Sequence, residues 1–494
     1  MAIENGGISL ENSVELRRVV YSVLLTQIQF GIYHYREKLP NIEETSTRLC
    51  VSIDTARAAY LKLKEEGYIT LSKNIGATVK VNYDANETEH FIQTFFSARE
   101  KAMTDLKNSI LPLLGNAQWT GLKNASPETL LAMEQLFHHE NPVVPYAMLK
   151  HLNQKYRSLG NSLLMRLVWQ IFMFLYDPFF GIEENLQYFD QSNGYLPEVL
   201  SLCRNKDWYS LRIKVNQSIE RLSSALSRFY ENRITMSPPE TEVAFTWSSY
   251  KKSQQLCYSI AMELLISISR GVYPAGSLLP SQKELARQKG VSLSTMRRAL
   301  ELLGSVGAIK STKYVGTQVL SFDQATENSD FTKPVLQRRL IDMAESIQMF
   351  ALSCQNVSLL TLSSSGSDLA EVLCRQLREH RQFQRGETLS YFILDLIGKS
   401  APCQAIRTVY SELLRQFFWA YALRGMEKDQ NIINTMYAPY FDSLIGSLEN
   451  LDYSQFSASL EALIVFELRK TLSTMSRLGI PGVENILVPD TNVN

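Results

Sequence analysis

The sequence lacks the usual signs of a secreted or membrane protein. Its six cysteines are scattered without a C-x-x-C pair, and no basic-then-apolar leader stands at the start of the chain, which favours a reducing compartment. The most apolar run, LVWQIFMFLY from Leu167 to Tyr176, is far shorter than the roughly 20 residues that span a bilayer. We therefore expect a cytoplasmic protein without a membrane partner.

Motifs of the common catalytic classes are also missing. We find no G-x-S-x-G, no phosphate-binding loop, no H-E-x-x-H and no Cys/His constellation, so we do not expect an enzyme. Among the six histidines, the His138-His139 pair could chelate and His151 could be a ligand, but lone histidines are more often surface or core residues. We expect no metal and no cofactor.

Neither charge sign dominates. Lys and Arg number 50, as do Asp and Glu, so a nucleic-acid partner would have to be bound through local patches. The 494 residues are too many for one ordinary core and predict roughly two to four domains.

An internal repeat is the main positive signal. VSLSTMRRAL at 291–300 is an altered copy of VSIDTARAAY at 51–60, and identical residues recur at this offset of 240 from Leu24/Leu264 to Val79/Val319 without a gap. Such self-similarity predicts two copies of one structural unit.

Each copy predicts the same local order. In the second copy an amphipathic helix stops at Gly271, Ser281 with Glu284 forms a capping box for a short helix, and Ser292 or Ser294 caps the next helix. AIKSTKYVGTQVL then reads as a β-hairpin around a glycine-bearing turn. Two helices joined by a tight turn and followed by a hairpin form a winged helix-turn-helix.

These residues resemble the DNA-binding domain of the GntR-type bacterial transcription regulators. The family order G-x-Y, L-P-S, E-L-A, V-S-x-x-T-x-R-x-A-L, G-x-I, G-T-x-V stands almost complete in GVYPAGSLLPSQKELARQKGVSLSTMRRALELLGSVGAIKSTKYVGTQV. The first copy, GIYHYREKLPNIEETSTRLCVSIDTARAAYLKLKEEGYITLSKNIGATVKV, keeps the frame but changes the polar positions. The resemblance covers about 70 residues twice and implies double-stranded DNA as the partner.

The second copy carries the stronger DNA-binding prediction. A winged helix lays its second helix in the major groove, reads bases from the N-terminal end of that helix and contacts phosphates with its flanks. Lys and Arg outnumber Asp and Glu by five between Ser253 and Leu320, the sign that such a surface requires. The candidate contacts are Lys283, Ser292, Ser294, Thr295, Arg297, Arg298, Lys313, Gly316 and Thr317.

The first copy departs from the family where DNA contact is expected. Glu43 occupies the place of Lys283 and Asp54 that of Ser294, and both carboxylates would repel phosphate. DNA contact by this copy is therefore expected to be weaker, and retention of the domain for packing or partner binding is the alternative. Its candidate contacts are Ser52, Thr55, Arg57, Lys73 and Gly76.

The remaining chain reads as helices entered through the polar linkers YDANETEH and FDQATENSDFTKP. We predict a mainly α fold with internal duplication. Two winged helix-turn-helix domains (10–83 and 248–321) alternate with two all-helical bundles of effector or dimerisation type (84–240 and 332–482), and a tail (483–494) follows. In the bundles, Asp452 takes the place of Asp207, and a faint resemblance to the fatty-acid-responsive GntR branch suggests a small-molecule effector. The stripe of Met165, Trp169, Phe172, Met173 and Tyr176, with Arg166 at its edge, fits either a core or a ligand pocket.

Three functions follow from these residues. The favoured one is a DNA-binding regulator in which one chain acts as a pseudo-dimer on an asymmetric operator, because regulators of this kind usually pair to match two half-sites. The alternative is a protein-interaction or corepressor-like scaffold with degenerate winged helices, and an enzyme is the least favoured. Whether two chains pair further as a homodimer stays open.

Overall fold

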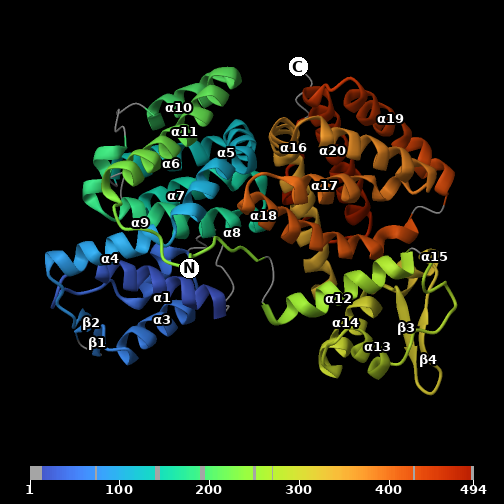
Figure 1. The fold of residues 1–494 in the computed structure, drawn as a ribbon, viewed down its shortest axis with the longest axis horizontal. Helices are drawn as coiled ribbons and strands as arrows, with labels where there is room; N and C mark the ends of the chain where they lie inside the picture. The colour runs from blue at the N-terminus through green and yellow to red at the C-terminus, as the bar shows by residue number, and fades with distance from the viewer. Residues whose placement is uncertain are drawn as a thin grey trace. The chain divides into compact units, whose positions relative to one another are not determined.

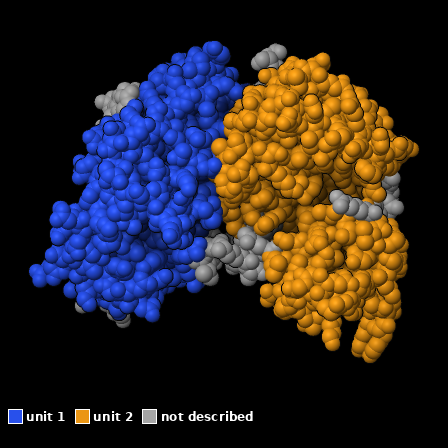
Figure 2. Space-filling view, in the orientation of Figure 1, with its two compact units in different colours: residues 1–246 blue, residues 247–494 orange. Residues whose placement is uncertain are grey.

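The computed structural model describes residues 14–72, 75–139, 145–189, 195–248, 252–269, 271–426 and 429–490. The chain divides into two compact units, residues 1–246 and 247–494, coloured separately in Figure 2. The sheets among the described residues are two antiparallel hairpins, one in each unit. Helices make up most of the rest (Figure 1).

The first unit starts with three helices and a hairpin, which we call the first module (14–79). Its elements are α1 (Val14–Gln29), α2 (Ile42–Leu49), α3 (Ile53–Glu65), β1 (Ile69–Ser72) and β2 (Gly76–Val79). An all-helical region follows, made of α4 (Ala85–Ser97), α5 (Glu100–Lys123), α6 (Pro127–His139), α7 (Pro145–Tyr156), η1 (Arg157–Leu159), α8 (Ser162–Ile171), η2 (Phe172–Tyr176), α9 (Asp177–Phe180), η3 (Glu183–Tyr188), α10 (Tyr195–Asn205) and α11 (Trp208–Arg233).

The second unit has the same order at its start, which we call the second module (252–319). Its elements are α12 (Lys252–Ser269), α13 (Gln282–Gln288), α14 (Leu293–Ser305), β3 (Ile309–Thr312) and β4 (Gly316–Val319). The helical region comprises α15 (Phe322–Asn328), α16 (Pro334–Gln382), η4 (Gly386–Thr388), α17 (Leu389–Ser400), α18 (Gln404–Leu414), η5 (Arg415–Met426), α19 (Gln430–Glu449), α20 (Tyr453–Arg477) and η6 (Val483–Asn485).

The two modules follow the same backbone path. Left-handed backbone recurs at five pairs of positions 240 residues apart: Gly31/Gly271, Arg36/Gly276, Cys50/Gly290, Gly67/Gly307 and Gly76/Gly316. The pair Cys50 and Gly290 makes the tight turn between the two helices of the helix-turn-helix, where φ is 54° and 63°. Glycine adopts this conformation without a steric penalty, whereas a side chain such as that of Cys50 is disfavoured there.

The hairpins also agree in register. Ile69 pairs with Val79 in the first module, and Ile309 pairs with Val319 in the second. In each, the second strand also bridges to the chain before the helix-turn-helix, through Lys38 and Thr78 or through Leu278 and Gln318. The wing is therefore tied to the helices by backbone hydrogen bonds as well as by its apolar face.

Capping side chains start the helices of the second module. Ser292 and not Ser294 caps α14, since the Ser292 hydroxyl accepts from the Thr295 N–H at 3.2 Å. Ser281 caps α13 in the same way through Glu284 N–H. The predicted capping box is only half formed, because the Glu284 carboxylate bonds Arg287, at 2.7 Å, and Gln288 instead of the backbone of Ser281.

Three residues of the apolar stripe pack into the core of the first unit. Trp169, Phe172 and Met173 belong to one buried cluster with residues of α1, α2 and α3. The Trp169 indole N–H donates to the Leu49 carbonyl at 2.7 Å, at the end of α2. Ser162–Phe180 is the one helical stretch in the described part of the chain long and apolar enough to cross a membrane, and 78% of it is buried within the protein.

Both predicted linkers contain helices. Asp84 and Glu87 form a complete capping box, so the first linker opens α4 instead of remaining extended. In the second linker α15 forms, with Ala325 fully buried and the Thr326 hydroxyl donating to the Ala422 carbonyl at 3.0 Å. Local propensity to turn is thus overridden by capping and by packing against the bundle.

The predicted tail packs on its bundle as far as residue 490. Val483 and Ile486 are 6% exposed, and the Gln348 amide donates to the Leu487 carbonyl at 2.7 Å. Residues 10–13 of the first predicted domain and 491–494 of the tail lie outside the described residues.

The bundles share one local feature that the sequence match suggested. Asp207 caps α11 and Asp452 caps α20, each accepting a backbone N–H three residues on. The residue before each cap, Lys206 or Leu451, is left-handed, with φ of 56° and 53°. The same turn and cap therefore start a long helix in both units.

Candidate nucleic-acid interface

The N-terminal end of α14 presents hydroxyl groups and then an arginine. The Ser292 hydroxyl lies 2.9 Å from that of Ser294 and 2.8 Å from that of Thr295, so the three form one local network. Ser292, Ser294 and Arg297 are exposed, while Thr295 is half-buried. A helix N-terminus with a positive end and free N–H groups favours an anion such as phosphate.

Arg297 is the most available cation of this helix. Its side chain is exposed, and no ion pair forms at it within the described ranges. Lys283, on the preceding helix α13, is exposed as well. An unpaired guanidinium can bind guanine O6 and N7 or a phosphate through two hydrogen bonds without first breaking an internal ion pair.

The wing adds a residue that sequence reasoning missed. A three-residue turn, Lys313 to Val315, joins β3 to β4, and Tyr314 at its tip is 94% exposed with φ of 65°. The Lys313 ammonium lies 5.0 Å from the centroid of the Tyr314 ring. The signal was available in the sequence, because the tip of so short a hairpin turn cannot be buried by its own strands.

The predicted wing residues Gly316 and Thr317 help to form the hairpin itself. Gly316 has φ of 120° and begins β4 opposite Thr312. The Thr317 hydroxyl lies 3.0 Å from that of Ser311 across the strands. Both lie at the base of the turn, whereas Tyr314 stands at its tip and is almost fully exposed.

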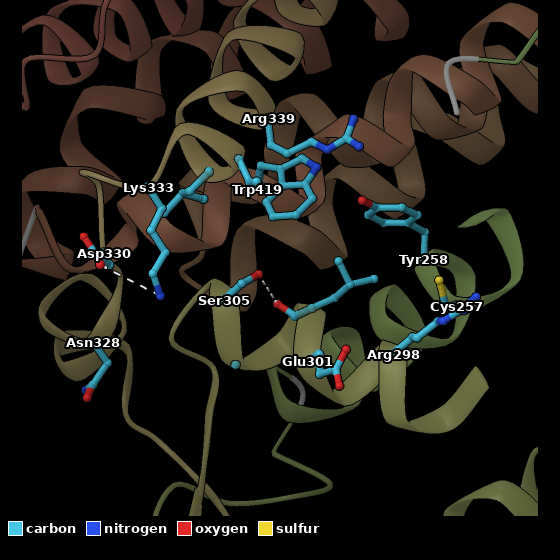
Figure 3. A pocket seen from close by; sticks show the side chains of 14 residues that line it. Cys257, Tyr258, Arg298, Glu301, Ser305, Asn328, Asp330, Lys333, Arg339 and Trp419 are labelled. Atoms are coloured by element: carbon cyan, nitrogen blue, oxygen red, sulfur yellow. Dashed lines mark hydrogen bonds and ion pairs between the residues drawn. The ribbon is translucent and has the colours of Figure 1, made fainter. Parts of the chain in front are cut away.

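Arg298 is exposed like Arg297, and it also lines a cavity. The cavity has a volume of about 580 Å³ and is bounded by α12, α14, the start of α16 and Trp419 (Figure 3). Neighbouring residues on a helix point about 100° apart. The two arginine side chains therefore leave α14 in different directions, and DNA contact by Arg298 stays a prediction.

The first module differs at the matching positions. The Arg57 guanidinium donates a hydrogen bond to the Asp54 carboxylate at 2.8 Å. The two residues lie one turn apart on the surface of α3 and form an ion pair. Thr55 is completely buried, so in this conformation it supports the cap of α3 at Ser52 and is not a surface contact. The first module thus presents an arginine paired with a carboxylate, whereas the matching arginine of the second module forms no ion pair within the described part of the chain.

The remaining predicted residues of the first module contribute little more. Ser52 is half-buried as the cap of α3, and Gly76 has φ of 85° at the start of β2. Lys73 lies outside the described residues.

A buried carboxyl lies beneath the first module. Asp177 is 2% exposed, and the Gln27 amide of α1 donates to it at 3.4 Å and to the Tyr146 hydroxyl at 2.8 Å. Burial raises the pKa of Asp177 to about 7, although the hydrogen bond from Gln27 acts in the opposite direction. The protonation state of this group changes near neutral pH.

No group of three metal-ligating side chains occurs within the described ranges. His151 is buried, at 7% exposure. The side chains of His138 and His139 lie outside what the structure describes.

Comparison with known proteins points to one family. Residues 258–319 match the family model described as bacterial regulatory proteins, gntR family. Among solved structures, the chain is similar to Streptococcus agalactiae GntR, with 16% identity over 43% of this chain and 99% of that one, and a TM-score of 0.21. No curated protein matches the chain.

Proposed function

We propose that this chain is a DNA-binding regulator of the GntR type, as the family match at residues 258–319 indicates, and that its second module reads double-stranded DNA. In this proposal α14 enters the major groove, Arg297 contacts a base edge, Lys283 contacts phosphate, and the wing lies against the backbone. The observation that carries it is the exposed Arg297 without an ion-pair partner in the described structure, one turn into a helix capped by Ser292.

The two modules act as unlike halves of one covalent reader. The shared element order, the left-handed positions and the equal hairpin registers support an internal duplication. A single chain would then occupy an asymmetric operator, with the second module supplying most of the affinity. This assignment also implies a cytoplasmic protein whose bundles bind a small-molecule effector and shift the relative placement of the readers.

A partner-binding role for the first module is the second candidate. The Arg57–Asp54 ion pair favours it, because it leaves the N-terminal end of α3 with less positive charge than the N-terminal end of α14. A chain that binds DNA would lose retention steeply with added salt, whereas a protein scaffold would not.

The first experiment is selection of bound DNA from a random pool by the purified chain at two salt concentrations, with its mass in solution. Two unlike half-sites at fixed spacing, bound by one chain, are the expected result. A palindrome bound by two chains would mean that one module from each reads DNA. No enrichment at either salt concentration would remove the DNA-reading proposal in favour of the scaffold.

Arg297→Ala should then cost roughly 1 to 3 kcal/mol of discrimination at one base pair. Arg57→Ala should cost less, because Arg57 is already paired with Asp54. The affinities are measured on the selected duplex and on single-base variants of it. Equal losses for the two substitutions would contradict the ranking of the modules.

A further inference from the structure

The cavity beside α14 has the size and the position of a regulatory site. Its volume of about 580 Å³ lies within the range of small-molecule pockets. It lies wholly within the second unit, and its walls come from the second module and from the helical region that follows. Arg298, Glu301, Leu302 and Ser305 of α14 line it, so the proposed recognition helix is itself one wall.

The inner wall of the cavity is aromatic and apolar. Trp419 is 2% exposed and Tyr258 is 7% exposed, and their rings meet edge to face at 6.0 Å between centroids. Leu336 adds a buried aliphatic side chain to the same wall. An aromatic pair and an aliphatic residue suit a ligand with an aromatic, apolar body.

The charged rim offers one cation that is not engaged by a carboxylate. Arg339 bonds the buried Asp342 at 3.1 Å, and the Lys333 ammonium lies 3.8 Å from Asp330. Arg298 has no ion pair within the described part of the chain, and its side chain lies beside Cys257 in Figure 3.

The acidic residues of the rim limit the charge of the ligand. Glu301 lies one turn beyond Arg298 on α14 without an ion pair to it, and Asp330 closes the other side. Because these carboxylates would repel a second negative group, the rim suits a single negative charge.

We propose that this cavity binds a small monocarboxylate with a flat apolar body. The carboxylate would accept two hydrogen bonds from the Arg298 guanidinium, and the flat body would lie against Tyr258 and Trp419. The regulatory part of the inference rests on the proposed function: Arg298 and Arg297 are adjacent on α14, so a ligand held by the first shifts the helix that presents the second to DNA.

Binding is tested on the full chain by titration calorimetry with 2-naphthoate, its neutral amide 2-naphthamide, and acetate. We expect 2-naphthoate to bind, and both the amide and acetate to bind at least about tenfold more weakly, since each lacks half of the recognised chemistry. No measurable binding of 2-naphthoate, or equal binding of the amide, would overturn the proposal.

Two neighbouring arginines provide a matched pair of variants. Arg298→Met should weaken 2-naphthoate binding by about tenfold or more, whereas Arg297→Met, the same change one residue earlier, should leave it unchanged. Leu302→Trp, which fills the cavity, should abolish binding, and circular dichroism verifies that each variant is folded. Loss in Arg297→Met equal to that in Arg298→Met would place the ligand elsewhere.

The two proposals can fail separately. If 2-naphthoate binds and no DNA is selected, the site stands and the DNA-reading function fails. If DNA is selected and 2-naphthoate does not bind, the reverse holds. If both bind but the ligand leaves DNA affinity unchanged, the coupling through α14 is refuted, and a change of affinity that disappears in Leu302→Trp supports it.

Discussion

Exchanging one residue between the two modules tests how the ion pair on α3 limits DNA contact. Asp54 and Ser294 are equivalent positions, yet Asp54 holds Arg57 at 2.8 Å while Arg297 has no such partner in the described structure. Ser294→Asp places a carboxylate one turn from Arg297, and Asp54→Ser removes the one beside Arg57. The two substitutions should therefore act in opposite directions.

The magnitudes follow from the exposure of the pair. The Arg57 and Asp54 side chains are 54% and 69% exposed, and such a pair contributes about 0.2 to 1 kcal/mol. Asp54→Ser should thus strengthen DNA binding only by about 1.4-fold to fivefold. Ser294→Asp should weaken it by roughly tenfold to a hundredfold, because it engages the arginine whose base contact is worth about 1 to 3 kcal/mol and adds repulsion to phosphate.

Fluorescence anisotropy on the selected duplex, at two salt concentrations, measures both effects. Ser294→Asn serves as the control for side-chain size, and Arg57→Ala in the Asp54→Ser background should cancel the gain. The salt slope should fall by about one phosphate contact in Ser294→Asp. Unchanged affinity in Ser294→Asp would show that this end of α14 does not face DNA, and weaker binding in Asp54→Ser would show that Asp54 itself contacts the duplex.

The remaining predictions concern stability. The pKa of Asp177 is about 7 in the folded protein and about 3.9 in the unfolded chain. The folded protein therefore keeps a proton that the unfolded chain releases, so the free energy of unfolding should fall as pH rises from about 4 to 7, by up to about 4 kcal/mol. Asp177→Asn should flatten this pH dependence in urea unfolding, and an unchanged profile would show that the carboxyl is not the cause. Gly307→Ala should destabilise the second unit by more than Gly67→Ala does the first. Both glycines are left-handed, but only at Gly307 would a Cβ meet backbone, 2.1 Å from the Ala325 carbonyl oxygen, whereas Gly67 has open space. If the two variants lose equally in unfolding midpoint, the backbone strain of alanine at positive φ outweighs the clash with Ala325.

Local chemistry explains why so much of the modules was predictable. Caps such as Ser292 and turns such as that at Gly290 act over a few residues, and their spacing is written directly in the sequence. Because matching positions lie 240 residues apart, each element predicted in one copy also predicts the corresponding element in the other. The bundles were predicted only as helical, because which helix faces which depends on contacts between distant residues.

Long-range packing decided the points on which the sequence was silent or misleading. Thr55 reads as a polar surface residue, but the fold buries it beneath the start of α3. Trp169 could equally have lined a pocket, and its bond to the Leu49 carbonyl assigns it to the core. The sequence around each residue does not reveal either outcome. Burial of Thr55 depends on how α3 packs in the module, and the position of Trp169 depends on its contact with Leu49, which is distant in the sequence.

The sequence alone indicated the resemblance to the GntR family, the element order of both modules, and the acidic replacements Glu43 and Asp54 in the first, since these depend on residue type and spacing. Only the tertiary structure decided which polar residues are available. It leaves Arg297 without an ion pair among the described residues, pairs Arg57 with Asp54, and places Arg298 at the edge of a cavity. The physical reason is that residue type sets which interactions a side chain can form, whereas availability depends on what the folded chain brings beside it.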